Sequence, residues 1–216
     1  MHLKQPDAPD LPPELARLEE KPAALRGLEL SEQLVAAQDW SSVDAADIRL
    51  TECRLDNVAL DEAKLQRANI HDVMVTGGSW ANADASGAVV RRAEFRNVRL
   101  TGLSFANATL DDVVFADCRL DLASFRFAKL VRTRFEGCLM AEADFYGAGV
   151  TSTVYSSCSL ARASVAEVTF ADTELRSCDL TGLGNAERLR GVRMPWADVV
   201  QSADVLAEAV GIEIGD

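Results

Sequence analysis

Large apolar residues recur at every fifth position through most of this chain. The series starts at Leu50 and ends at Leu180, and Ala85 is the one small residue in it. Two positions before each member stands Ala, Val, Cys, Thr or Gly, with Ile48 and Leu103 as the exceptions. All charges of the segment fall on the other three positions of each unit. A helix is excluded, because a five-residue step advances about 140° past a full turn and leaves no apolar face.

The same pattern fits very short strands joined by tight turns. Residues two apart point to the same side of a strand, so a small–polar–large triplet places both ends inward and the middle residue outward. The two polar residues that follow must then turn a corner. We therefore predict a coil of short strands with a closed apolar interior and a polar exterior.

A second and longer period, of four such units, gives the number of strands in one coil. Like residues repeat at every twentieth position in three columns: Cys118, Cys138, Cys158 and Cys178; Phe95, Phe115, Phe135 and Tyr155; and Phe105, Phe125 and Phe145. The columns between the aromatic ones are aliphatic. Stacking of like on like predicts four faces per coil, two opposite faces being aromatic; Cys53 and Phe170 do not fit these columns.

Several units carry a known consensus. Ala123-Ser124-Phe125, Ala143-Asp144-Phe145 and Cys178-Asp179-Leu180 resemble the pentapeptide-repeat family, whose consensus is roughly A-(D/N)-L-x-x. The resemblance covers about residues 43–183 and implies an all-β fold, a right-handed quadrilateral parallel β-helix with four pentapeptides per coil and short terminal capping helices. It is specific for the fold and weakly specific for function.

The flanking segments are expected to cover the open ends of the coil. Residues 1–42 are predicted to form a tail, a short helix over 10–20 and a degenerate lead-in in which Leu28, Leu30 and Trp40 point inward. Residues 43–183 form the β-helix, and 184–216 a linker and a helix that Pro195 opens and Gly211 ends. That helix carries an apolar stripe, which consists of Trp196, Val199, Val200, Ala203, Leu206 and Val210. The stripe either caps the coil or, as the resemblance to gyrase-protecting family members implies, forms a homodimer contact.

Nothing in the sequence favours an enzyme, a cofactor or a metal site. The stacked cysteines form a straight column rather than a tetrahedron, so core thiols are expected. His2 lies in the tail and His71 at an outward corner position. The neighbouring carboxylates Asp61-Glu62 and Asp111-Asp112 are also outward, with no apolar pocket to raise a pKa.

Charge and hydropathy limit which partners and which cellular location are expected for the protein. The formal charge of −12 excludes the usual basic nucleic-acid-binding surface. The sequence contains no run of 18 or more apolar residues, so we do not expect a membrane-spanning helix. Its first residues contain no apolar stretch of the kind found in a secretory signal. A cytoplasmic protein with reduced thiols is the expectation.

These observations favour a non-catalytic interaction scaffold that binds an unidentified protein through its outer surface. The outward residues Phe127, Val131 and Tyr146 are the candidates for apolar contact, and Asp61, Glu62, Asp121 and Glu142 for an acidic column. The alternative, implied by the family resemblance, is a DNA mimic that binds DNA gyrase and gives quinolone-type resistance. Against it, basic residues on one face would repel a basic binding saddle: Arg91, Arg92, Lys129 and Arg132.

Overall fold

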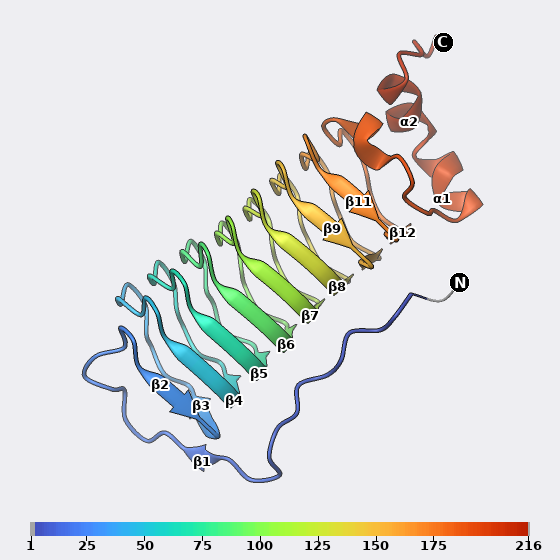
Figure 1. The fold of residues 1–216 in the computed structure, drawn as a ribbon. Coiled ribbons are helices and arrows are strands. Elements are labelled where there is room, and N and C mark those ends of the chain that lie inside the picture. The colour runs from blue at the N-terminus through green and yellow to red at the C-terminus, as the bar shows by residue number, and fades with distance from the viewer. Residues whose placement is uncertain (1–2, 216) are drawn as a thin grey trace.

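The computed structural model describes residues 3–215 as a solenoid of parallel strands with two short helices at its C-terminal end (Figure 1). Its five longest strands have eight residues each: β4 (Arg49–Asp56), β5 (Asn69–Thr76), β6 (Val89–Arg96), β7 (Thr109–Ala116) and β8 (Lys129–Glu136). The shorter strands are β1 (Ala16–Arg17), β2 (Glu29–Ser31), β3 (Gln33–Ala36), β9 (Gly149–Thr151), β10 (Val154–Ser156), β11 (Thr169–Ala171) and β12 (Glu174–Arg176). They are followed by the 3-10 helix η1 (Ala186–Leu189) and the helices α1 (Trp196–Gln201) and α2 (Ala203–Ala209).

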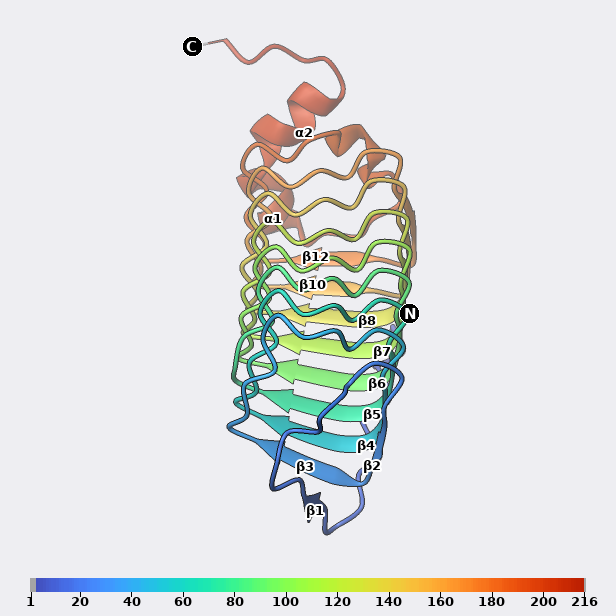
Figure 2. The ribbon, with the colours of Figure 1, turned by 90° about the vertical axis from the view of Figure 1, so that its left-hand side faces the viewer.

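Each coil pairs in parallel with the next at an offset of four pentapeptides, as the sequence period predicts. Phe95 lies opposite Phe115, and Phe115 opposite Phe135. One column of stacked residues runs in this register from Val35 to Leu175, from β3 to β12. The coils are seen on top of one another in Figure 2. The predicted parallel β-helix is confirmed.

The interior is filled by the two predicted aromatic columns. Phe115 stacks between Phe95 and Phe135, with ring centroids 5.0 Å away on both sides. On the opposite face Phe125 stacks on Phe145 at 4.8 Å. The columns also meet edge to face, as in the 5.9 Å contact between Phe125 and Phe135. Rings from opposite faces therefore close the core without a central channel.

The N-terminal flank differs from the prediction. No helix forms over residues 10–20; the segment is irregular apart from the short strand β1, so the predicted N-terminal capping helix was wrong. The amides of Ala16 and Leu18 donate to carbonyls of the first coil instead of to each other. The Pro12-Pro13 pair accounts for this, because a residue before proline avoids the helical region.

The lead-in to the repeats is more regular than expected. β2 and β3 both pair with β4, so a coil forms before residue 43. Trp40 is fully buried as predicted, whereas Leu28 and Leu30 are half-buried against the core. No helix within residues 3–215 has the length and apolar character needed to cross a membrane.

Candidate protein-binding surface

The corners of the solenoid share one backbone conformation. Every fifth residue from Ser42 to Gly182 has a positive φ, in the left-handed region. This region suits Gly and, less well, Asn and Asp, and it is unfavourable for bulky side chains. All corners from 42 to 182 are described, and only Leu122 and Phe127 among them are large apolar residues, with φ of 59° and 56°. Leu122 is 58% exposed and Phe127 is 52% exposed.

Phe127 belongs to a small aromatic cluster on the outside of the molecule. Its ring meets the ring of Tyr146 edge to face at 5.4 Å. The guanidinium of Arg126 lies 4.6 Å from the centre of the Tyr146 ring and donates to Asp144 at 2.6 Å. A Cβ on Gly147 would lie 2.7 Å from the Phe127 ring, so this glycine leaves room for it. The pairing of Phe127 with Tyr146 follows from their places in adjacent coils, as predicted.

The third apolar candidate, Val131, lies away from this cluster. It is in β8, paired with Asp111 on one side and with Thr151 on the other. The sequence places Val131 one corner beyond Phe127, and the structure keeps it on that neighbouring face.

The four acidic candidates are not brought together. Asp61 and Asp121 share a column but stand three coils apart, and Glu62 and Glu142 are four coils apart. Asp61 accepts from the amide of Ala81 at 2.7 Å. Asp121 lies 3.9 Å from Arg119, and Glu142 lies 2.8 Å from Arg162. The four carboxylates therefore form two pairs, Asp61 with Glu62 and Asp121 with Glu142, three coils apart instead of one continuous acidic column.

Many corner carboxylates are matched by an arginine one coil further on. Arg67 donates to both oxygens of Asp47 at 2.7 Å, and this contact lowers the pKa of the Asp47 carboxyl. Arg92 lowers the pKa of Asp72 in the same way. Arg92 is one of the arginines that argue against DNA mimicry, and it is therefore neutralised by an acidic residue within the fold. The same pairing also neutralises part of the acidic charge that DNA mimicry would need.

The C-terminal stripe is divided between two helices. α1 and α2 meet at Ser202, and Val205, which the predicted stripe omitted, is their buried contact to the core. Val199 and Leu206 are half-buried, as a cap requires. The other four members of the stripe are exposed: Trp196, Val200, Ala203 and Val210. The prediction of a single amphipathic helix was wrong, since the helix is interrupted at residue 202 and four of the six stripe residues are exposed.

The cysteines are buried thiols in the small inward positions. Cys158 donates to the carbonyls of Ser156 and Phe135. Hydrogen bonds between neighbouring thiols, together with burial, raise the pKa of Cys138 and Cys158 to about 12. Within residues 3–215 no cluster of three or more His, Cys, Asp or Glu side chains could hold a metal ion. His71 lies 3.4 Å from Asp72 at the outer surface, and His2 is outside the described residues.

Two features escaped the sequence reasoning. The left-handed corners were not anticipated, although the Gly, Asn and Asp residues that recur at this position are their signal. The second is the path of residues 3–13, which lie against the solenoid and cover Asp72 and Asp112, although Asp112 was expected at an outward position. Prolines at every third position of this segment are the signal for it.

Comparisons with known proteins agree with this architecture. Residues 88–154 match a family model described as a pentapeptide repeat region. No curated protein matches the sequence. Among solved structures, HetL of the cyanobacterium Nostoc sp. strain PCC 7120, described as involved in heterocyst differentiation regulation, is 17% identical, with 81% of this chain and 93% of that chain covered and a TM-score of 0.40. Full-length QnrB1, described as a plasmid-mediated fluoroquinolone resistance protein, is 18% identical, with 87% and 92% covered and a TM-score of 0.48.

The matched residues form β6 to β10, the middle of the solenoid. The same five-residue pattern and the same pairing between coils continue before and after them. The chain therefore contains a pentapeptide repeat region over residues 88–154, and it folds as a parallel β-solenoid.

Proposed function

We propose that this protein is a non-catalytic scaffold that binds a protein partner through its outer surface, around Leu122 and Phe127. The observation that carries the proposal is that these two left-handed corners hold large apolar side chains that are exposed. A left-handed backbone costs a bulky residue about 1–2 kcal/mol, and such strain is typically retained at functional sites. At the other corners between residues 42 and 182 the chain uses glycine or polar residues, so the two apolar side chains are an exception that folding does not require.

The face between these two corners suits a flat contact. Its outward positions hold small side chains in successive coils, where Ser104 pairs with Ser124 and Asp144 with Ser164. Leu122 begins this face and Phe127 ends it. Exposed aromatic side chains next to a guanidinium are typical centres of protein interfaces. The charge of −12 favours a partner whose apolar contact is bordered by basic residues.

The experiment compares capture of a partner with stability. Leu122→Asn and Phe127→Asn place at each corner a residue that tolerates the left-handed conformation. The matched control is Arg67→Asn, at a corner of the Phe127 column three coils away with φ of 57°. We expect a host-extract protein retained on the immobilised chain to be lost with the first two variants and kept with the third. Equal retention by all three would contradict the proposal.

A second copy of the chain is the candidate partner at the C-terminal end. Trp196 is 78% exposed and Val200 is 57% exposed, one turn apart on α1. If α1 forms a homodimer contact, Trp196→Asp will convert a dimer into a monomer in light scattering. A monomer in the unmodified chain would contradict it.

Binding to DNA gyrase remains the alternative function. Net acidity and a straight rod favour it, whereas arginines such as Arg67, Arg92 and Arg132 pair with the acids of the adjoining coil. A salt-sensitive inhibition of gyrase supercoiling at micromolar protein would support this alternative. Unchanged supercoiling and unchanged quinolone tolerance on expression would exclude it.

A further inference from the structure

One corner of the solenoid is covered by a segment from the other end of the sequence. We call residues 3–13 the N-terminal arm; Figure 1 shows it in dark blue, running along the side of the coils towards their C-terminal end. Beneath the arm, acidic and basic side chains alternate at the same corner of four successive coils. This set, the corner track, consists of Asp72, Arg92, Asp112 and Arg132.

The carboxylates of the track are buried although they occupy outward positions. Asp72 is 2% exposed and Asp112 is 8% exposed. Each receives the Nε–H of an arginine one coil away, Arg92 and Arg132 respectively, at 2.7 Å. Although burial opposes it, Arg132 lowers the pKa of Asp112, so the carboxylate stays charged beneath the arm.

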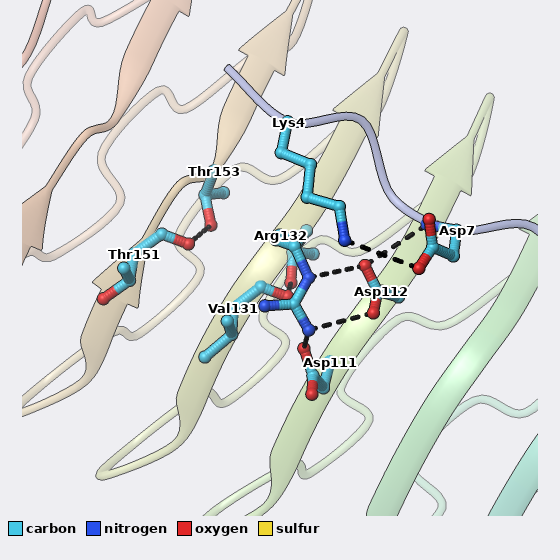
Figure 3. A network of polar contacts seen from close by, with 9 residues as sticks. Lys4, Asp7, Asp111, Asp112, Val131, Arg132, Thr151 and Thr153 are labelled. Carbon is cyan, nitrogen blue, oxygen red and sulfur yellow. Dashed lines mark hydrogen bonds and ion pairs between the residues drawn. The ribbon is translucent and has the colours of Figure 1, made fainter.

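The arm is held by its backbone at regular intervals. The amide of Asp10 donates to Asp72 at 3.0 Å, and the amide of Asp7 donates to Asp112 at 3.2 Å. Figure 3 shows the second contact, together with the ion pair between Lys4 and Asp7. Further along, the Arg134 guanidinium donates to the side-chain oxygen of Gln5. Two coils separate Asp72 from Asp112, and three arm residues cover that distance.

The spacing of these contacts identifies the backbone conformation that fits. A polyproline II segment rises about 3.1 Å per residue, which is about 9.3 Å for three residues. Two coils at the usual strand spacing rise about 9.6 Å. The segment also has three residues per turn, so every third residue faces the same way. In the arm this series is Leu3, Pro6, Pro9 and Pro12, and all four are half-buried, whereas the residues between them are exposed except Leu11.

The arm sequence itself enforces this conformation. Each proline fixes its own φ, and it moves the residue before it towards extended backbone. Among residues 5–13 only Asp7 and Asp10 are neither a proline nor the residue before one. Both supply the amides that the track binds. Their carboxylates lie near Arg92, whose pKa is raised by Asp72 and further by Asp10 and Asp7.

We propose that the corner track is a binding site for a segment in the polyproline II conformation with two proline–aspartate pairs three residues apart, and that the N-terminal arm is the segment that fills it in this chain. The track binds the backbone amides of the two aspartates, and its Arg92 attracts their carboxylates. Prolines face the solenoid because they are the residues that need no hydrogen bond. A tethered segment occupies such a site at high effective concentration, so a free peptide of the same kind binds only when the arm is released.

The first test measures the arm in the full chain by amide hydrogen exchange. We expect the amides of Asp7 and Asp10 to exchange at least ten times more slowly than those of Ala8 and Leu11. Insertion of one alanine between Ala8 and Pro9 shifts the two amides out of step, and one of them should lose its protection. Equal exchange at all four amides, or protection that survives the insertion, would overturn the proposal.

The second test asks whether the track binds the same segment from outside. In the full chain, Pro6, Pro9 and Pro12 are replaced by glycine, which removes the preorganised conformation and frees the track. A fluorescent peptide with the sequence of residues 3–14 should bind this variant at least ten times more tightly than the unmodified chain. No binding at millimolar peptide, or equal binding to both chains, would overturn the proposal.

Two further substitutions in the released chain assign the binding to the track. Asp72→Asn with Asp112→Asn should weaken peptide binding at least tenfold. Asp47→Asn is the matched control, since Asp47 is paired with an arginine in the same way but touches no arm residue, and it should change nothing. An equal effect of both would overturn the assignment.

Discussion

The corner at Leu122 gives the sharpest quantitative test of the backbone argument. Its φ is 59°, and its side chain is 58% exposed. Relief of the left-handed strain by Leu122→Gly contributes about 1–2 kcal/mol. The greater freedom of glycine in the unfolded chain takes back about 0.5–1 kcal/mol. We therefore expect a net stabilisation of up to about 1.5 kcal/mol, or up to about 6 °C in Tm for a chain of this size.

Leu122→Ala is the matched control for this prediction. It removes the same exposed side chain but keeps a Cβ, so the strain remains and Tm should not rise. Both variants and the unmodified chain are compared by differential scanning calorimetry and by denaturant unfolding. If glycine and alanine have the same effect, or glycine destabilises the protein, the strain at this corner is not what the φ value implies.

Three further predictions concern the interior. Gly78→Ala should destabilise the solenoid by more than about 2 kcal/mol in denaturant unfolding, because its Cβ would lie 2.3 Å from the Val58 carbonyl oxygen at a φ of 82°; an unchanged midpoint would contradict this. Phe115→Ala should cost about 3–5 kcal/mol, since the ring is fully buried between two others; a loss below about 1 kcal/mol would show that the stack carries little. The thiols of Cys138 and Cys158 should resist a disulfide reagent at pH 8 until the protein unfolds, because their pKa is raised to about 12. Because the raised pKa values mean that the folded state holds the two thiol protons more tightly than the unfolded state, the free energy of unfolding should fall as pH rises from about 9 towards 12. Rapid labelling of the native protein would refute both statements.

The solenoid could be predicted because the interior residues recur in the sequence with two exact periods, one of five residues and one of twenty. A residue such as Phe115 has the same neighbours in every coil, so a column of like residues indicates stacking directly. The columns also predicted the meeting of Phe127 with Tyr146. The pattern places Gly78 at a small inward position, and the structure gives the reason for a glycine there, the close approach of the Val58 backbone.

The flanks could not be predicted in the same way. The arm gains its order from contacts with Asp72 and Asp112, which lie several coils away in the sequence. The segment over 10–20 has the local signals of a helix start, and those signals alone led to the helix prediction. At the C-terminal end, Ser202 interrupts the apolar stripe because the helices must turn to cover the last coil, and one-dimensional periodicity contains no information on that turn.

The positions of the candidate surface residues could be predicted only in part. Exposure of Phe127 and Tyr146 followed from their outward positions, but a strained backbone at Leu122 and Phe127 became visible only in the φ angles. The acidic candidates were chosen by charge, and charge does not show which carboxylate has an arginine beside it. Asp47 and Arg67, at the same corner of successive coils, illustrate how the coil repeat itself creates such pairs.

Photo-crosslinking tests most directly whether the strained corners are where a partner binds. Phe127 is replaced by benzoyl-phenylalanine in the full chain, and the same photoreactive residue is placed at Arg67 as the matched corner. Irradiation in extract of the native host should join one defined protein to the chain from position 127 and none from position 67. The same products from both positions, or none from position 127, would contradict the account.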